Sequence, residues 1–242
     1  MKLWWSEKVQ FIKPYNLHHF IYIAILLISL YFLIRKREKI RENPNKLRFF
    51  LLFLSLFQQI LLYTWYFLET SFSLGEALPL HICRISTILG IWFLITKNNK
   101  VLDTMFYFGL YAYGSFLYPS RVYPIYHAVG ISFIINHTVT ILLPWFAYIA
   151  YGWKPKLKAL KKSSLYFLLY FTFVYFLNPF IDGNYFYLKY RPFFKNWPEH
   201  IYVPFLVLGT LAGFYTAYKL ANKFLPEQDS LDNKNKNRTA FL

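Results

Sequence analysis

Long apolar stretches separated by short polar segments recur along the whole chain. A helix needs about 20 mostly apolar residues to cross the hydrocarbon core of a bilayer, and backbone groups in lipid must be bonded within helices or closed barrels. The alternating ten-residue strands of a barrel are not seen in the sequence. Seven stretches are therefore predicted as transmembrane helices: Tyr15–Ile34, Phe49–Leu68, Leu78–Thr96, Val101–Tyr118, Tyr126–Tyr151, Ser163–Ile181 and Ile201–Tyr218.

The predicted fold class is all-α, a polytopic membrane protein built as one bundle of seven helices over residues 1–225. The polar segment 226–242 is predicted to be a disordered tail. Composition supports this class, since 57% of the 242 residues are hydrophobic and only 16% are charged, against about 25% charged in soluble domains. One cysteine excludes a disulfide scaffold.

The basic residues are distributed unevenly between the two sides of the predicted bundle. Nineteen Lys and Arg follow the first, third, fifth and seventh stretches, and seven lie on the other side. The positive-inside rule then predicts an outer N-terminus and a cytoplasmic C-terminus. Because these charges flank membrane spans, they account for the net charge of +16 without a nucleic-acid partner. Multi-pass insertion in a cell membrane is expected, and the composition favours a bacterial plasma membrane.

Three reactive or charged side chains lie at the start of the third stretch, where lipid makes such groups costly. His81 and Arg84 are three residues apart and share a helix face, with Cys83 beside them. Pro79 fits the first helical turn, which would place Cys83 about 6 Å along the axis. Cys83 is either a small buried apolar residue or a nucleophile. His81 and Arg84 have structural alternatives too, and for Arg84 these are a snorkelling cation or an ion pair with Glu69, Glu76 or Asp103.

The fifth stretch contains the adjacent pair Asn136 and His137, and a histidine here serves either interhelical hydrogen bonding or general base catalysis. A Cys–His pair requires that both side chains lie at the same depth in the membrane. If the helix starts near Tyr126, His137 lies about 16 Å along its axis, and if it starts near Ser132, His137 lies about 8 Å along it. Only the later start matches the depth of Cys83 without a tilt or a break.

The loop after the sixth stretch contains Asp182 and Asn184. Turn chemistry explains both residues, but they lie on the same side as Cys83 and are candidates for orienting His137 or contacting a headgroup. No phosphate loop, HExxH or GxSxG motif occurs in the sequence, and neither a metal nor a soluble cofactor is implied.

The segment from Leu78 to Cys83 resembles the PLHxC signature of the YwaF-type bacterial integral membrane proteins. The Asn136-His137 pair and the segment from Gly183 to Leu188, followed by Arg191-Pro192, are similar to later motifs of that family. The resemblance covers roughly residues 55–218. Animal relatives of the family are transmembrane acyltransferases that remodel phospholipids, so the resemblance implies that Cys83 matches their acyl-accepting cysteine and His137 their catalytic histidine.

Two hypotheses follow from the sequence. In the first, Cys83 attacks an ester of a membrane phospholipid with His137 as base, and the acyl-thioester passes to a second lipid hydroxyl or to water. An oxyanion donor is needed, for which Asn136, Asn184, His81 and Arg84 are candidates. In the second, the chain is a transporter or a partner subunit, which predicts a water-filled path that reaches both faces. The sequence leaves the oligomeric state open.

Overall fold

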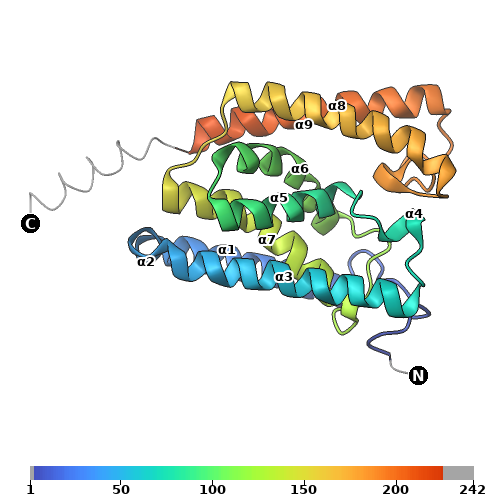
Figure 1. The fold of residues 1–242 in the computed structure, drawn as a ribbon, viewed down its shortest axis with the longest axis horizontal. Helices are drawn as coiled ribbons and strands as arrows, with labels where there is room; N and C mark the ends of the chain where they lie inside the picture. Colours follow the sequence, from blue (N-terminus) through green and yellow to red (C-terminus); the bar gives the residue numbers. More distant parts are fainter. Residues whose placement is uncertain (1–2, 226–242) are drawn as a thin grey trace, which may run out of the picture.

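The structure is a computed structural model that describes residues 3–225, and the predicted tail 226–242 lies outside them. The helices of this part run side by side along the long axis (Figure 1). Their bounds are α1 Leu17–Arg35, α2 Arg37–Glu42, α3 Pro44–Glu69, α4 Leu74–Ala77, α5 Ile82–Thr96, α6 Asn99–Leu117, α7 Ala128–Tyr151, α8 Leu157–Phe180, the 3₁₀ turn η1 Tyr185–Tyr187, and α9 Glu199–Phe224. No strand occurs between residues 3 and 225, which confirms the all-α prediction for the described chain.

Each of the seven predicted stretches corresponds to one helix. Five of these helices, α1, α3, α7, α8 and α9, are long and apolar enough to cross a membrane. Helix α5 is apolar but has only 15 residues, and α6 has 19 residues but is not among the five. The short elements α2, α4 and η1 were not predicted, because they are too short to show a hydrophobic period.

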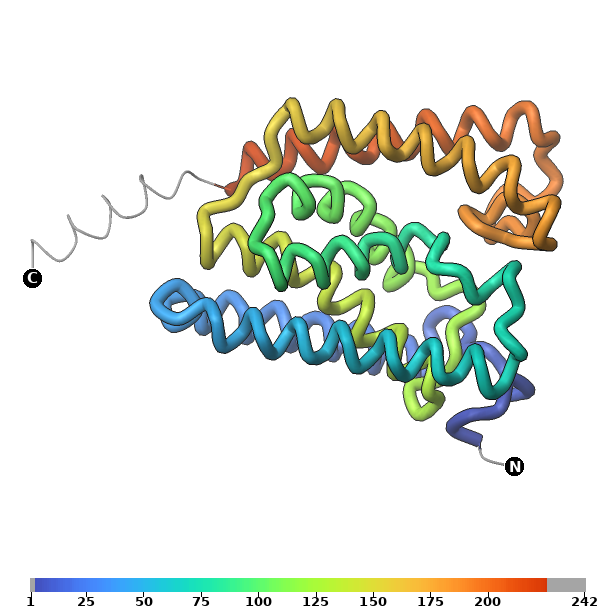
Figure 2. The backbone as a smooth tube through the Cα atoms, viewed as in Figure 1, coloured from blue at the N-terminus to red at the C-terminus, as the bar shows by residue number. Residues whose placement is uncertain are grey.

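Helix α7 is at the centre of the bundle and packs against α1, α2, α3, α5 and α6, while α6 connects it to α8 and α9 (Figure 2). Fifteen residues of α7 are buried, compared with three of the 26 residues of α9. The outer helices turn large apolar side chains outward, among them Phe53 of α3, Phe176 of α8 and Leu208 of α9. An apolar outer surface of this kind suits a lipid surrounding.

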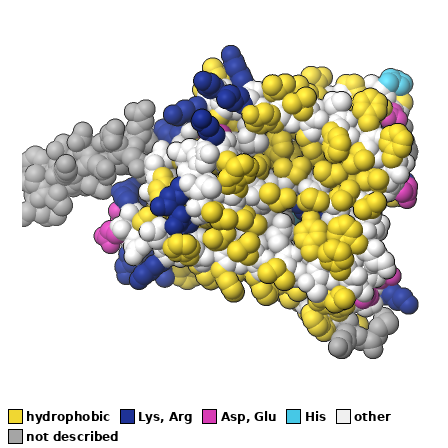
Figure 3. Space-filling model, viewed as in Figure 1, with side chains coloured by type: hydrophobic (Ala, Val, Ile, Leu, Met, Phe, Trp, Pro, Cys, Tyr) yellow, Lys and Arg dark blue, Asp and Glu magenta, His cyan; other side chains and the backbone are white. Residues whose placement is uncertain are grey.

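The two ends of the bundle differ in charge. Most of the visible Lys and Arg side chains gather at the end where α2 and the C-terminal end of α9 lie (Figure 3). We call this the basic end, and the end that holds α4 and the N-terminal segment the opposite end. The uneven charge distribution found in the sequence is thus also a property of the folded molecule.

The start of α5 differs from the sequence prediction. Residue Leu78 is extended (φ −57°, ψ 148°) because the following Pro79 disfavours helical geometry, and the helix starts only at Ile82 with His81 as N-cap. Cys83 is therefore the second helical residue rather than about one turn in. Helix α5 spans about 22 Å, against about 36 Å for α7.

Candidate functional site

A cavity of about 640 Å³ lies at the opposite end of the bundle. The exposed residues Glu7 and Arg121 at its margin bring it to the surface. Its walls come from seven segments of the chain: the N-terminal segment, the end of α3, α4 with the start of α5, the end of α6 with the loop that follows it, the first half of α7, the loop after α8, and the start of α9. No residue of the basic end lines it.

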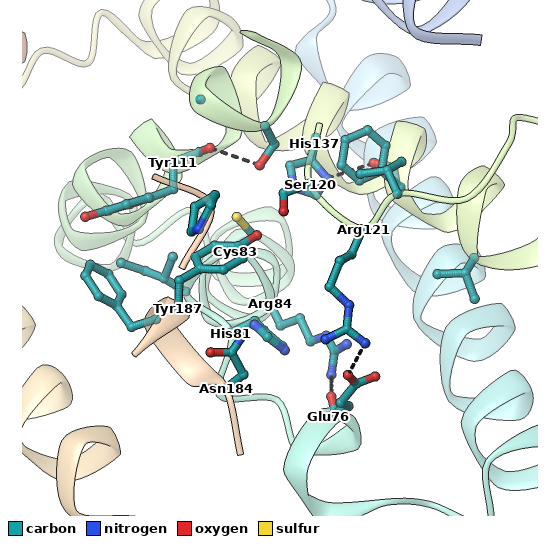
Figure 4. A pocket seen from close by; sticks show the side chains of 18 of the residues that line it. Glu76, His81, Cys83, Arg84, Tyr111, Ser120, Arg121, His137, Asn184 and Tyr187 are labelled. Carbon is teal, nitrogen blue, oxygen red and sulfur yellow. Dashed lines mark hydrogen bonds and ion pairs between the residues drawn. The ribbon is translucent and has the colours of Figure 1, made fainter. Parts of the chain in front are cut away.

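Cys83 lines this cavity from the first turn of α5 and is half-buried (Figure 4). The Ser115 hydroxyl interacts with its thiol, and the phenol rings of Tyr111, Tyr170 and Tyr187 lie close enough to influence it electrostatically. Sequence reasoning missed these four neighbours, because Ser and Tyr occur throughout the helices without a distinctive spacing. The thiol is thus surrounded by hydroxyl groups rather than by carboxylates.

His137 lines the same cavity from α7, and its ring nitrogens have different roles. Nδ1 lies 2.9 Å from the backbone oxygen of Phe133. A carbonyl oxygen only accepts, so Nδ1 carries the hydrogen of the neutral ring, and Nε2 keeps an unprotonated lone pair. The tautomer is therefore the one that a general base acting through Nε2 requires.

A hydrogen-bonded bridge connects the thiol helix to the histidine helix. The Thr87 hydroxyl, one turn after Cys83, lies 2.9 Å from the Cys83 carbonyl oxygen and also contacts the side-chain oxygen of Asn136. It can donate its single hydrogen to either of these two acceptors. The Thr140 hydroxyl reaches the same Asn136 oxygen at 3.4 Å. Because Asn136 precedes His137, this bridge sets the register of the two candidate residues across α5 and α7.

Of the two starts considered for the histidine helix, the structure has one close to the early start. Helix α7 begins at Ala128, close to the early start, and yet Cys83 and His137 line one cavity. The expectation of a start near Ser132 assumed that α5 and α7 begin at one level. The rings of Phe93 and Tyr151, near the basic ends of these helices, lie 6.4 Å apart, so the shorter α5 begins deeper inside the bundle.

Two hydrogen-bond donors face this region without an acceptor in the described chain. The N–H groups of Arg84 and Ile85 bond to the His81 carbonyl at 2.8 and 3.1 Å, but no described group accepts from the N–H of Cys83. The oxygen of the Asn136 amide is engaged by threonines, and its NH₂ donates to no described group. Both donors therefore stay available for an anionic oxygen.

Arg84 forms none of the three ion pairs considered from the sequence. Its guanidinium donates to the backbone oxygens of Glu76 (2.5 Å) and Leu78 (3.1 Å) and to the Tyr66 hydroxyl. It thus ties the segment before α5 to α3. His81 also lines the cavity, and its ring packs edge-on against Tyr185 at 4.8 Å.

The two candidates in the loop after α8 have different positions. Asn184 lines the cavity, but its side-chain oxygen accepts from the N–H groups of Lys189 (2.9 Å) and Tyr190 (2.8 Å), which closes the loop. Asp182 does not line the cavity: its side chain is 87% exposed and pairs with Lys189, whose pKa this hydrogen bond raises. Neither residue orients His137, since Phe133 holds that ring.

Two other histidines of the described chain have structural bonds. The His19 ring bonds to the backbone oxygen of Phe116 at 2.6 Å, and the His127 ring caps α7 by accepting from Val129 N–H. Within residues 3–225 no three His, Cys, Asp or Glu side chains are grouped closely enough to hold a metal ion.

No curated protein and no solved structure matches this chain. The model of the TMEM164 family matches residues 14–218, which include every helix from α1 to the larger part of α9 and both Cys83 and His137. A match over most of the chain, together with five helices able to cross a membrane, means that the protein is a multi-pass membrane protein and belongs to the TMEM164 family.

Proposed function

We propose that the protein is a membrane-embedded lipid acyltransferase, or an acyl hydrolase, that works through a thioester on Cys83. The observation that carries the proposal is that the sole cysteine and His137 line one cavity, with the His137 tautomer fixed for base catalysis. A thiol and an imidazole from separate helices are the elements of a Cys–His nucleophilic pair. The resemblance to the YwaF-type proteins and their acyltransferase relatives supports the same pairing.

The reaction divides into two transfers. His137 Nε2 removes the thiol proton, the sulfur attacks the ester carbonyl, and the N–H of Cys83 with the Asn136 amide stabilises the oxyanion. The intermediate then expels the lysolipid oxygen, which takes the proton from His137 and leaves the acyl group on sulfur. In the second transfer His137 deprotonates a lipid hydroxyl or water, and the resulting oxygen attacks the thioester. The C–S bond then breaks, the acyl group leaves on oxygen, and His137 returns the proton to the Cys83 thiolate.

The proposal includes the placement in the membrane. In it, seven helices span the bilayer: α1, α3, α5, α6, α7, α8 and α9. The longer helices shield α5 and α6 from lipid, and the basic end faces the cytoplasm. The cavity then opens in the outer leaflet, where phospholipid esters lie. Its confinement to one end favours this enzyme over a transporter, which needs a path to both faces.

A thioester-trapping experiment tests the proposal. Purified protein is incubated with phospholipid labelled in its acyl chain, precipitated, and treated with neutral hydroxylamine, which cleaves thioesters much faster than oxygen esters. The expected result is hydroxylamine-labile label on the wild type and none on Cys83→Ser. An unlabelled wild type, or equal labile label on Cys83→Ser, would refute the acyltransferase proposal.

A further inference from the structure

Arg84 carries a buried charge without a carboxylate partner among the described residues. It is 9% exposed, and its three hydrogen bonds end on two backbone oxygens and the Tyr66 hydroxyl. The nearby Tyr63 hydroxyl also interacts with this guanidinium. Buried charges in proteins are ordinarily paired, and a guanidinium has five N–H donors, of which these bonds use three. Arg84 therefore retains both charge and donors for an anion.

Arg121 supplies a second guanidinium at the same place. It comes from the loop between α6 and α7, lines the same cavity, and donates to the Glu76 carboxylate at 2.8 Å. Because Arg84 donates to the backbone oxygen of Glu76, both guanidinium groups converge on one residue (Figure 4). These three side chains carry a net charge of +1. The other cavity-lining carboxylate, Glu7, belongs to an exposed residue of the N-terminal segment.

We infer that Arg84 and Arg121 form a phosphate-binding subsite, which holds the phosphodiester of the lipid whose ester is presented to Cys83. Arginine matches phosphate geometry through paired N–H donors, and a phosphodiester carries the single negative charge that the cluster lacks. Arg84 and Cys83 line one cavity, so a phosphate bound to Arg84 keeps the glycerol backbone, and with it the ester, in the space that the thiol faces. The inference rests on the proposed function and adds the residues that recognise the headgroup.

A binding measurement tests this inference independently of catalysis. The purified full-length chain in detergent, carrying Cys83→Ser to prevent turnover, is titrated with phosphatidylethanolamine and with diacylglycerol of the same acyl chains, and the bound fraction is read by native mass spectrometry. The variant is Arg121→Gln, because Arg121 is half-exposed and its removal leaves the Arg84 bonds intact. The matched control is Arg191→Gln, at the same end of the bundle but outside the cavity.

The expected result is binding of the phospholipid about tenfold or more tightly than diacylglycerol, in line with charge-assisted hydrogen bonds. Arg121→Gln should remove most of that preference, Arg121→Lys should restore part of it, and Arg191→Gln should keep it. Equal affinity for the two lipids, or equal behaviour of the two glutamine variants, would overturn the inference. If inorganic phosphate competes with lipid binding while the phospholipid is not preferred over diacylglycerol, the arginines bind a soluble anion instead, and this result would also overturn the inference. Hydroxylamine-labile label on the wild-type protein would still support the proposed function, even if the binding measurement overturned this inference.

Discussion

The His137 ring combines a structural bond and a free nitrogen. Nδ1 is held by the Phe133 carbonyl one turn earlier, so the ring needs no carboxylate to fix its tautomer. The sequence predicted His137 itself but suggested Asp182 or Asn184 as its orienting partner. A backbone carbonyl has no sequence signature, which is why that part of the site could not be predicted.

Replacing His137 by Asn separates these two roles. The Asn amide can still donate to the Phe133 carbonyl, so the stability should change by no more than about 1 kcal/mol. Loss of the ring nitrogen should slow thioester formation by roughly 10²–10⁴-fold, the usual contribution of a general base. The rate of labelled-acyl transfer to Cys83 measures this. His127→Asn is the matched control, since His127 caps the same helix outside the cavity, and an equal loss of rate in both variants would contradict the role of His137.

Among the elements, the pair α5 and α7 determines whether the site can exist. The apolar stretches predicted both helices to within a few residues at most ends. Their relative depth could not be predicted, because it depends on where α5 starts. That start is set by Leu78, which is extended before Pro79, and by packing of the helix ends at the basic end. Hydrophobic periodicity carries no information about such offsets.

Thr87→Val should weaken the connection between α5 and α7. The substitution keeps the shape of the side chain but removes the hydroxyl shared by the Cys83 carbonyl and the Asn136 amide. Loss of buried hydrogen bonds should lower the free energy of unfolding by about 1–2 kcal/mol and slow thioester formation as the two helices lose register. Thermal unfolding in detergent measures the first effect.

The control for this prediction is Thr96→Val on the same helix. Thr96 makes the same type of bond to the carbonyl four residues earlier (2.8 Å, to Trp92) but is exposed, and its hydroxyl otherwise only accepts from the N–H of Asn98 in the adjoining turn (3.3 Å). Its substitution should change stability by no more than about 0.5 kcal/mol. If both variants lose equal stability, the bridge to Asn136 contributes nothing.

At the scale of the whole molecule, charge and cavity lie at opposite ends. The nineteen basic residues counted on one side in the sequence include those seen at the basic end, and the cavity is lined only by the other end. The sequence thus predicted the class of fold and the side of the site. The cavity walls could not be predicted, since they combine side chains from seven separate segments of the chain.

The membrane orientation predicts opposite labelling of two loops. In a Cys83→Ser background, a membrane-impermeant maleimide added to intact cells should modify Ser73→Cys, in the exposed turn before α4. Asn98→Cys, in the exposed loop between α5 and α6, should react only after the cells are opened. The gel shift of the modified protein reports both. The reverse pattern would place the basic end outside and contradict the positive-inside assignment.

The short length of α5 has a consequence for which molecules can meet the thiol. Since this helix begins below the level at which α7 begins, a reactive carbonyl has to descend between the surrounding helices before it comes within bonding distance of sulfur. A flexible acyl tail would enter such a cavity more easily than a folded peptide would. If Cys83 carries a thioester as proposed, the recessed helix start would shield it from bulky acceptors.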